Sequence, residues 1–445
     1  MHIHSISHKA YIRLALPFTL STVTQPLLGA VDTAVVGRLD NPSFIGGVAI
    51  GTVIFNTLYW LFGFLRVATS GFAAQSLGQK KLEPGVHAWL RPLIIAAGIG
   101  LLFICCQKPI LQGALLIYDA EPDVTVHAVR YFRILIWGAP MVLISYVNLG
   151  WLMGRGHVRQ VMLLQIGTNM LNILLDTLFV LYFHMGVAGV ATATLISQAS
   201  GLFLGILLIS PQLPLNTIKK YSKGLLEASA MKKLASVNSD LLIRTVCLLT
   251  MTNIFVARGS SMGTDILAAN AILFQLQYLI AYFFDGLANA ASVFAGKFVG
   301  SGDLTAFAQT RSIAHLNLIG LVFILVAGLL LLDLPLIRIF TNIEPVVTLC
   351  EQYLFYILLF LLTMPLGLVY AGFYIGATCS APIRNSLILS LLFFLLMENL
   401  LIPKWGNHGL WTAFIVFCAV RSAVLYFSWH QLTRHAFKAV QPSSC

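Results

Sequence analysis

One carboxylic acid stands alone in a long apolar stretch near the start of the chain. Asp32 is the only ionisable residue between Arg13 and Arg38. Ser21 and Gln25 precede it by 11 and 7 residues, a spacing that puts the three side chains on one face of an α-helix. Inside a membrane, desolvation disfavours the charged form of a carboxylic acid and favours the protonated form. The spacing and setting therefore predict that Asp32 takes up and releases a proton.

A second set of polar side chains follows helical spacing in a later apolar window. The members of this stripe are Gln165, Asn169, Asn172 and Asp176. Thr192 and Thr194 come in the next window, after a turn at Gly186 and Gly189. We expect these amide, hydroxyl and carboxyl groups to connect Asp32 with Asp176 by hydrogen bonds, directly or through water. The alternative is a purely structural stripe that joins neighbouring membrane helices.

The second half of the chain has polar residues of its own inside apolar windows. The candidate site residues there are Arg244, Tyr278, Tyr282 and Asp285. Asp240 lies one helical turn before Arg244, which is also the spacing of an ordinary ion pair that supports a helix. Glu398 lies within about a helical turn of the position related to Asp176 by an internal repeat.

Composition places these groups in a membrane protein. Of 445 residues, 58% are apolar and 10% are charged, and the mean hydropathy is +0.87. A membrane-spanning helix needs about 20 apolar residues. Twelve windows of that kind are predicted, at 14–37, 46–74, 88–107, 131–153, 161–183, 187–210, 235–257, 266–295, 313–333, 352–376, 385–403 and 408–430. The predicted fold is therefore an all-α membrane protein with twelve transmembrane helices, in contact with the lipid bilayer.

The two halves of the chain resemble each other at a nearly constant offset in the numbering. The motif Gly150-x-x-x-Gly154 recurs as Gly372-x-x-x-Gly376, at an offset of 222. The segment 65–74 resembles 287–296 at the same offset, and 186–193 resembles 406–413 at an offset of 220. A duplicated, strongly apolar chain is typical of a transporter whose binding site lies between its halves.

The long polar connection between the halves sets the predicted domain limits. We predict an N-lobe at 1–212, a cytoplasmic connection at 213–233 and a C-lobe at 234–445. Six spans per half make the repeat parallel, with its axis along the membrane normal. Pro17 and Pro26 each remove a backbone donor from the first helix and are predicted bending points.

The net charge of +11 arises from a one-sided distribution rather than from a nucleic-acid surface. On the predicted topology, seventeen Lys and Arg residues lie on one side of the membrane and seven on the other. The positive-inside rule then places both termini in the cytoplasm. We expect a multi-pass protein of the bacterial inner membrane, with no nucleic-acid partner. The seven cysteines show no metal-ligand spacing, and we predict no cofactor and no bound metal.

These residues match a known family over essentially the whole chain. The run from Pro26 to Gly37 (PLLGAVDTAVVG) resembles the first-helix motif of the MATE (multidrug and toxic compound extrusion) transporters. Asn172 and Asp176, followed by 186–194 (GVAGVATAT), resemble the fifth and sixth helices of that family. The runs 65–71 (LRVATSG) and 238–244 (NSDLLIR) resemble its DinF-like branch.

The resemblance implies two pseudo-symmetric six-helix lobes in a V-shaped arrangement, with alternating access. It also implies export of small hydrophobic or cationic drug-like substrates, here by a monomer. By motif, Asp32 would accept the coupling proton, Asn172, Asp176 and Thr194 would be its hydrogen-bonded neighbours, and Pro17 would bend the first helix. Protonation of Asp32 would then let the first helix bend at Pro17 or Pro26 and narrow the N-lobe cavity.

Three alternatives stay open at this level. The sodium-coupled branch of the family has acids on its seventh and tenth helices, whereas residues 353–372 here contain none, which favours protons without excluding sodium. A flippase for lipid-linked saccharides would need a cationic cavity, for which Arg66 and Arg244 are the candidates. An intramembrane enzyme would need clustered metal ligands or a nucleophile beside a base, and the eleven histidines are scattered. We therefore predict a transporter and not an enzyme.

Overall fold

The computed structural model describes the backbone at residues 6–36, 42–118 and 121–437. Side chains are described over the same ranges except at 23–36, 42, 117–118 and 333. Within these ranges the chain is helical with short turns and no strand. The prediction of an all-α protein is therefore confirmed wherever the backbone is described.

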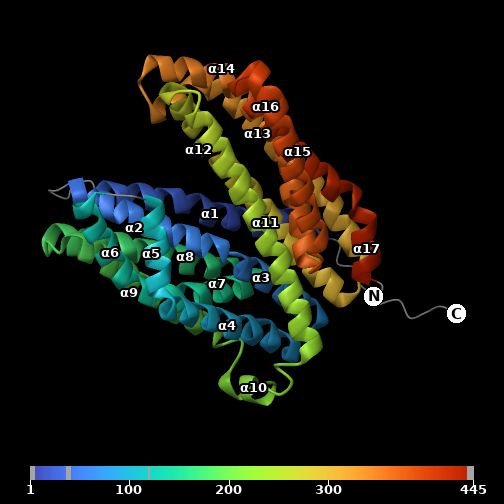
Figure 1. Cartoon of the computed structure of the whole chain (residues 1–445). Helices are drawn as coiled ribbons and strands as arrows, with labels where there is room; N and C mark the ends of the chain where they lie inside the picture. The colour runs from blue at the N-terminus through green and yellow to red at the C-terminus, as the bar shows by residue number, and fades with distance from the viewer. Residues whose placement is uncertain (1–5, 37–41, 119–120, 438–445) are drawn as a thin grey trace. The chain divides into compact units, whose positions relative to one another are not determined.

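Nineteen helical elements follow one another along the described chain (Figure 1). In the first half they are α1 His8–Val36, α2 Pro42–Leu61, α3 Phe64–Gln79, α4 Leu82–Cys105, α5 Gln107–Tyr118, α6 Pro122–Leu135, η1 Ile136–Gly138, α7 Ala139–Gly154, α8 Val158–Asp176, η2 Thr177–Tyr182 and α9 Gly186–Ile209. In the connection and the second half they are α10 Leu215–Lys220, α11 Ala228–Ser260, α12 Thr264–Ser301, α13 Leu304–Phe340, α14 Glu344–Gly376, α15 Ala381–Trp405, α16 Asn407–Phe427 and α17 Trp429–Phe437.

The helices agree with the predicted windows one by one. Among the described residues, 11 helical stretches are long and apolar enough to cross a membrane. Each of them overlaps one predicted window, from Ser43–Gln79 to Asn407–Phe427. The remaining predicted window, 14–37, coincides with the helix α1.

The coordinates divide the chain into two compact units. The N-unit is Val23–Ala235, and the C-unit combines Met1–Thr22 with Ser236–Cys445. The first part of α1 thus belongs with the second half of the sequence, whereas the rest of α1 belongs with the first half. The lobe limits predicted from the sequence stay a prediction, and the units differ from them chiefly over the segment Met1–Thr22.

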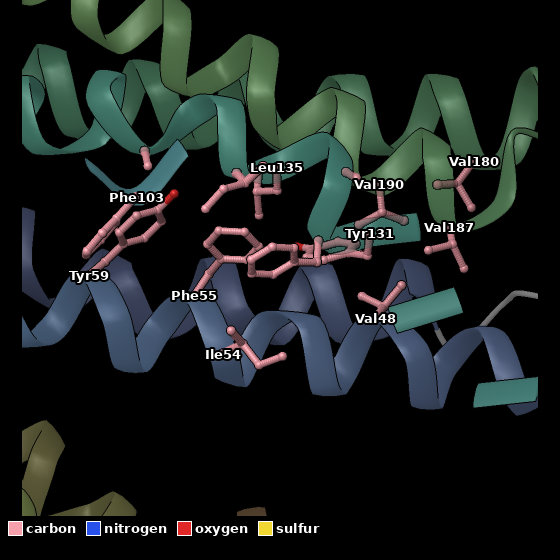
Figure 2. Packing of buried hydrophobic residues seen from close by; sticks show 14 residues of the cluster. Val48, Ile54, Phe55, Tyr59, Phe103, Tyr131, Leu135, Val180, Val187 and Val190 are labelled. Carbon is pink, nitrogen blue, oxygen red and sulfur yellow. The ribbon is translucent and has the colours of Figure 1, made fainter. Parts of the chain in front are cut away.

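The core of the N-unit is a cluster of aromatic and branched side chains between α2, α4, α6 and α9. Figure 2 shows Phe55 from α2 beside Tyr131 from α6, with Val187 and Val190 of α9 further along the same cluster. The Phe55 ring stacks on Phe132 with centroids 5.2 Å apart. Because such side chains fill the space between helices completely, they fix the helix positions that the polar residues depend on.

The internal repeat reappears as two equivalent helix crossings. In the N-unit, α7 crosses α3 so closely that a Cβ added at Gly150 would overlap the carbonyl oxygen of Arg66. In the C-unit, α14 crosses α12 in the same way, with Gly372 against the carbonyl oxygen of Ala288. Both members of the second contact follow their counterparts in the first at the offset of the internal repeat. The glycine motif singled out by the repeat is therefore a packing motif that allows two helix backbones to meet.

The two halves differ in the continuity of their helices. Ser43–Gln79 is interrupted by a turn between α2 and α3, whereas its counterpart α12 is one helix. The stretch Pro122–Gly154 contains the 3-10 turn η1, and its counterpart α14 is continuous. The third stretch, α8 with the π-helix η2, corresponds to the uninterrupted α15. The breaks are thus found in the N-unit at the positions where the C-unit has regular helix.

Candidate functional site

The polar stripe of α8 ends on a buried carboxyl group. Asp176 is the last residue of α8 and is 1% exposed. The side-chain amide of Asn172, itself 6% exposed, donates a hydrogen bond from Nδ2 to Asp176 Oδ2 at 2.9 Å. The spacing of four residues on one helix produces this contact. Gln165 and Asn169 lie on the same helix and are half-buried.

The helix changes its hydrogen-bonding pattern immediately after Asp176. Residues Thr177–Tyr182 form the π-helix η2, in which Phe183 N–H donates to the carbonyl oxygen of Leu178. π-Helical turns within helices are rare and are frequently found at functional sites. Asp176 therefore lies at the junction between regular helix and a locally widened turn.

The threonines of α9 are half-buried and hydrogen-bond within their own helix. Thr192 Oγ1 donates to the carbonyl oxygen of Ala188 at 2.7 Å, and Thr194 Oγ1 donates to that of Val190 at 2.9 Å. These bonds occupy the hydroxyl protons and leave the oxygen lone pairs as acceptors. The expected connection from these threonines to a carboxyl group stays a prediction.

Three of the predicted residues of the first helix have side chains outside the described residues. They are Gln25, Pro26 and Asp32, whose backbone belongs to α1. Pro17 is described and half-buried. The part of α1 before it lies against α12 in the C-unit, where the Tyr11 hydroxyl donates to the carbonyl oxygen of Leu287 at 2.7 Å.

In the C-unit, two buried carboxylates have arginine partners from distant helices. Asp240 accepts from Arg384 Nη1 at 2.6 Å and from Ser380 Oγ at 2.6 Å. Glu398 of α15 is 2% exposed and accepts from Nε of Arg258 at 2.8 Å and from Nη2 at 3.1 Å. Helical spacing pointed to a neighbour of Asp240 on the same helix, and it could not reveal partners on helices far away in the sequence.

The remaining C-unit candidates lie on α11 and α12. Tyr278, Tyr282 and Asp285 of α12 are half-buried, and Arg244 of α11 is half-buried as well. The carbonyl oxygen of Tyr282 accepts from the hydroxyl of Thr22 at 3.3 Å, so this face of α12 lies next to α1 within the same unit. Their predicted roles are not tested by this geometry.

One charged residue was not among the predicted site residues. Arg421 of α16 is 1% exposed, and the charges of Arg244 and Asp285 act on its guanidinium. The sequence placed Arg421 inside a helix, but no spacing connected it to the other two residues. Arg244, Asp285 and Arg421 are three charged residues of the same unit on three different helices, and we call them the C-unit charge cluster.

A cavity of about 350 Å³ lies in the N-unit between α3, α4 and the start of α11. Its polar lining includes Gln75, Glu83, Arg91, Glu227 and Lys233. The connection between the halves forms part of its surroundings, because Arg91 Nε donates to the carbonyl oxygen of Leu225 at 2.7 Å. No group of three or more His, Cys, Asp or Glu side chains that could hold a metal ion is present among the described residues.

Comparison with known proteins identifies the family. The MatE family model matches residues 17–178 and 241–398, one segment in each half of the chain. The chain belongs to the MatE family. It is 33% identical over 431 residues to the DNA damage-inducible protein F of Escherichia coli (strain K12), covering 96% of this chain and 93% of that protein. The predicted resemblance to the DinF-like branch is therefore confirmed.

More distant MatE proteins share the architecture. The probable multidrug resistance protein NorM of Shewanella oneidensis is 22% identical over 94% of this chain and 93% of its own. A solved structure described as "MATE in the bent conformation" superposes with a TM-score of 0.86 at 20% identity, covering 97% of this chain and 96% of that one. The predicted twelve-helix, two-lobe membrane fold is confirmed. Members of this family are transporters rather than enzymes, so the prediction of a transporter is confirmed as well.

Proposed function

We propose that this MatE protein exports drug-like molecules in exchange for protons. The observation that supports the proposal most directly is the buried carboxyl group of Asp176, held by the amide of Asn172 at the end of α8. A charged carboxylate at membrane depth is disfavoured by about 2.5–3.5 kcal/mol on insertion scales, so its presence calls for a functional reason. Reversible protonation is such a reason.

Protonation changes what this group can bind. As a carboxylate, Asp176 accepts hydrogen bonds from donors such as the Asn172 amide. As a carboxylic acid, it becomes a donor as well and loses its charge. The neighbouring π-helix η2 offers a backbone segment whose hydrogen bonds differ from those of regular helix, and such a segment can shift between arrangements. A proton at this position can therefore alter helix geometry in the N-unit.

Asp32 is the second member of the proposed coupling site, on the sequence argument given above. Its protonation would let α1 bend at Pro17 or Pro26 and reduce the space available to a substrate in the N-lobe. The proposed lobes are 1–212 and 234–445, joined by the connection 213–233. A proton drives this change only if it binds the two conformations with different affinity. The breaks in the N-unit helices support a mobile N-lobe, because irregular segments are where helices bend.

The names of the relatives support the proposed kind of substrate. NorM of Shewanella oneidensis is named as a probable multidrug resistance protein, which supports small hydrophobic or cationic drug-like cargo here. We propose a monomer in the bacterial inner membrane with both termini in the cytoplasm, and a proton rather than sodium as the coupling ion. The positive-inside asymmetry supports this orientation.

Transport by everted membrane vesicles tests the proposal. Accumulation of a fluorescent cationic drug in the vesicle lumen, which corresponds to efflux from the cell, is measured under an imposed pH gradient and, separately, under a sodium gradient. We expect the pH gradient to drive efflux and Asp32→Asn and Asp176→Asn to abolish it, with normal amounts of folded protein. Asp265→Asn is the matched control, because Asp265 is an exposed carboxylate at the start of α12 and should leave transport unchanged.

Two results would contradict the proposal. Efflux driven by sodium alone would replace the proton with sodium as the coupling ion. Undiminished proton-driven efflux in both Asp variants would show that the coupling site lies elsewhere in the protein.

A further inference from the structure

The cavity between α3, α4 and the start of α11 is lined by none of the residues assigned to proton coupling. Its volume of about 350 Å³ lies within the range of about 300–1,000 Å³ that is typical of small-molecule sites. All of its lining residues belong to the N-unit. Carboxylates, cations, amides and apolar side chains line it together, so it can contact a ligand that carries charges of both signs.

The cavity lies at the end of two membrane-spanning stretches. Residues 80–81 join the end of α3 to the start of α4. A Cβ built at Gly85 would lie 3.7 Å from Ser76 Oγ, so residues equally far from this connection lie side by side. On α4, Glu83 is in the first turn and Arg91 follows eight residues later, about 12 Å further along the helix axis. The carboxylate thus lies at the end of the span, and the guanidinium lies further into it.

Both cations of the cavity lie toward this inner end. Nε and Nη2 of Arg91 donate to the carbonyl oxygens of Leu225 at 2.7 Å and Gly224 at 3.1 Å, which fixes the position of the guanidinium. Nη1 takes no part in these two bonds. Lys233 Nζ lies 5.7 Å from the centroid of the Phe72 ring, a cation–π contact. Because Phe72 is seven residues before the last residue of α3, it lies at nearly the same depth as Arg91.

The carboxylates of the cavity are exposed at the starts of helices. Glu83 is in the first turn of α4, and Glu227 directly precedes α11. Each follows a large exposed apolar side chain, Leu82 at 54% and Leu226 at 68% exposure. Carboxylates and apolar surface therefore lie together where these two helices begin, as expected for a region in contact with the membrane interface.

The order of charges along α4 matches the headgroup of a zwitterionic phospholipid. In a phosphatidylethanolamine, the phosphate is nearer to the acyl chains and the primary ammonium is nearer to water. Along α4, Arg91 lies further into the span and Glu83 lies at its end. Guanidinium and ammonium groups donate to phosphate oxygens, and a carboxylate accepts from a primary ammonium. A ligand with only one sign of charge would meet like charges at one end of the cavity.

We propose that this cavity binds the phosphoethanolamine headgroup of a membrane phospholipid. Arg91 and Lys233 contact its phosphate, and Glu83 accepts from its ammonium group. On the proposed orientation, the lipid belongs to the cytoplasmic leaflet. The site goes beyond the proposed export function and does not depend on it, because headgroup binding is measured without transport.

Binding of two matched lipids tests this site. Dihexanoyl phosphatidylethanolamine and dihexanoyl phosphatidylglycerol share the phosphate and the acyl chains, and only the first has an ammonium group. Each is titrated into the delipidated full-length protein in detergent, and native mass spectrometry measures the bound fraction. We expect the unchanged protein to bind the ethanolamine lipid about two- to fivefold more tightly, as expected for an exposed pair of opposite charges.

Two variants of exposed side chains separate the contacts. Glu83→Gln should weaken binding of the ethanolamine lipid by about two- to fivefold and leave binding of the glycerol lipid unchanged or tighter. Lys233→Gln should weaken binding of both lipids by a similar factor, because both carry the phosphate. The matched controls are Asp123→Asn, an exposed acid in the first turn of α6, and Lys232→Gln, an exposed lysine outside the cavity lining. Neither control should change the binding of either lipid.

Four results would overturn the proposal. Binding of the glycerol lipid as tight as that of the ethanolamine lipid would remove the role of the ammonium group. Equal losses of both lipids in Glu83→Gln would do the same. Equal effects of Lys232→Gln and Lys233→Gln would show that general surface charge, rather than the cavity, binds the lipid. Free phosphoethanolamine that binds as tightly as the lipid would show that the ligand is a soluble molecule.

Discussion

At the scale of single residues, the carboxyl groups at equivalent positions of the two halves have different hydrogen-bond partners. Asp176 in the N-unit and Glu398 in the C-unit are related by the offset of the internal repeat, and both are buried. Asp176 accepts from the neutral amide of Asn172, whereas Glu398 accepts from the guanidinium of Arg258. The guanidinium supplies a full positive charge, so the C-unit position forms an ion pair. The N-unit position is the one assigned to proton exchange in the proposed mechanism.

Removal of the arginine from this pair is expected to destabilise the C-unit. In Arg258→Met, Glu398 keeps its burial and loses two hydrogen bonds of 2.8 and 3.1 Å. Because the Arg258 side chain is 46% exposed, solvent moderates the loss, and we expect about 1–3 kcal/mol of destabilisation. Thermal unfolding in detergent measures it. Arg338→Met, from an ion pair with side chains 43% and 67% exposed, should change stability by less than about 0.5 kcal/mol.

The comparison of these two arginine variants isolates the effect of burial, because both lose an ion pair with a glutamate. An equal loss of stability in both would show that the burial of Glu398 is irrelevant to the effect.

The sequence predicts contacts within one helix far better than contacts between helices. Helical spacing placed Asn172 and Asp176 on one helix face, where the structure has them hydrogen-bonded, because four residues make about one helical turn. The pair Arg258 and Glu398 was not predicted, because it joins two helices far apart in the sequence and helical spacing relates only residues of one helix. Arg421 was missed for the same reason, because its side chain contacts Met364 on α14, a helix other than its own.

At the scale of helices, hydropathy located the membrane spans but not their interruptions. The twelve windows were found because each needs a long apolar run, which a single sequence displays. The π-helix at Thr177–Tyr182 contains no proline or glycine, so no residue type in it predicts an interruption of the α-helix. The equivalent part of α15, at 399–404, is regular helix even though it contains Pro403. Packing against neighbouring helices decides between the two conformations.

The repeated glycine crossings are expected to be equally sensitive to an added methyl group. A Cβ at Gly150 or at Gly372 would overlap a backbone carbonyl oxygen that cannot move aside without moving a helix. We expect Gly150→Ala and Gly372→Ala each to destabilise the protein by about 1–3 kcal/mol. Gly98→Ala and Gly320→Ala are the controls, because nothing lies within 4 Å of a Cβ at either position. These controls should be neutral or slightly stabilising, since alanine favours helix over glycine by about 1 kcal/mol.

Thermal unfolding measures the stability of all four variants under the same conditions. If either crossing tolerates alanine as well as Gly320 does, the two helix backbones are further apart than the structure has them.

At the scale of the whole molecule, duplication explains the architecture and its asymmetry together. Two family-model segments, two glycine crossings and two sets of spans follow from one repeated half. The repeat does not require both copies to keep the same polar residues. The N-unit has a neutral carboxyl partner and three helix breaks that the equivalent C-unit helices lack. The C-unit has arginine-paired carboxylates and the C-unit charge cluster. The proposed proton-coupling residues, Asp32 and Asp176, both belong to the N-unit.

The orientation of the whole chain is testable through single cysteines. Lys223 lies in the connection between the halves and Lys404 near the end of α15, and both are exposed. The excess of Lys and Arg on the predicted inner side should keep that side in the cytoplasm during insertion, because cationic loops are retained there. In a variant without native cysteines, a membrane-impermeant maleimide added to intact cells should label Lys404→Cys and leave Lys223→Cys unlabelled. Permeabilised cells should show labelling of both. Labelling of Lys223→Cys in intact cells would invert the topology and, with it, the direction of the proposed export.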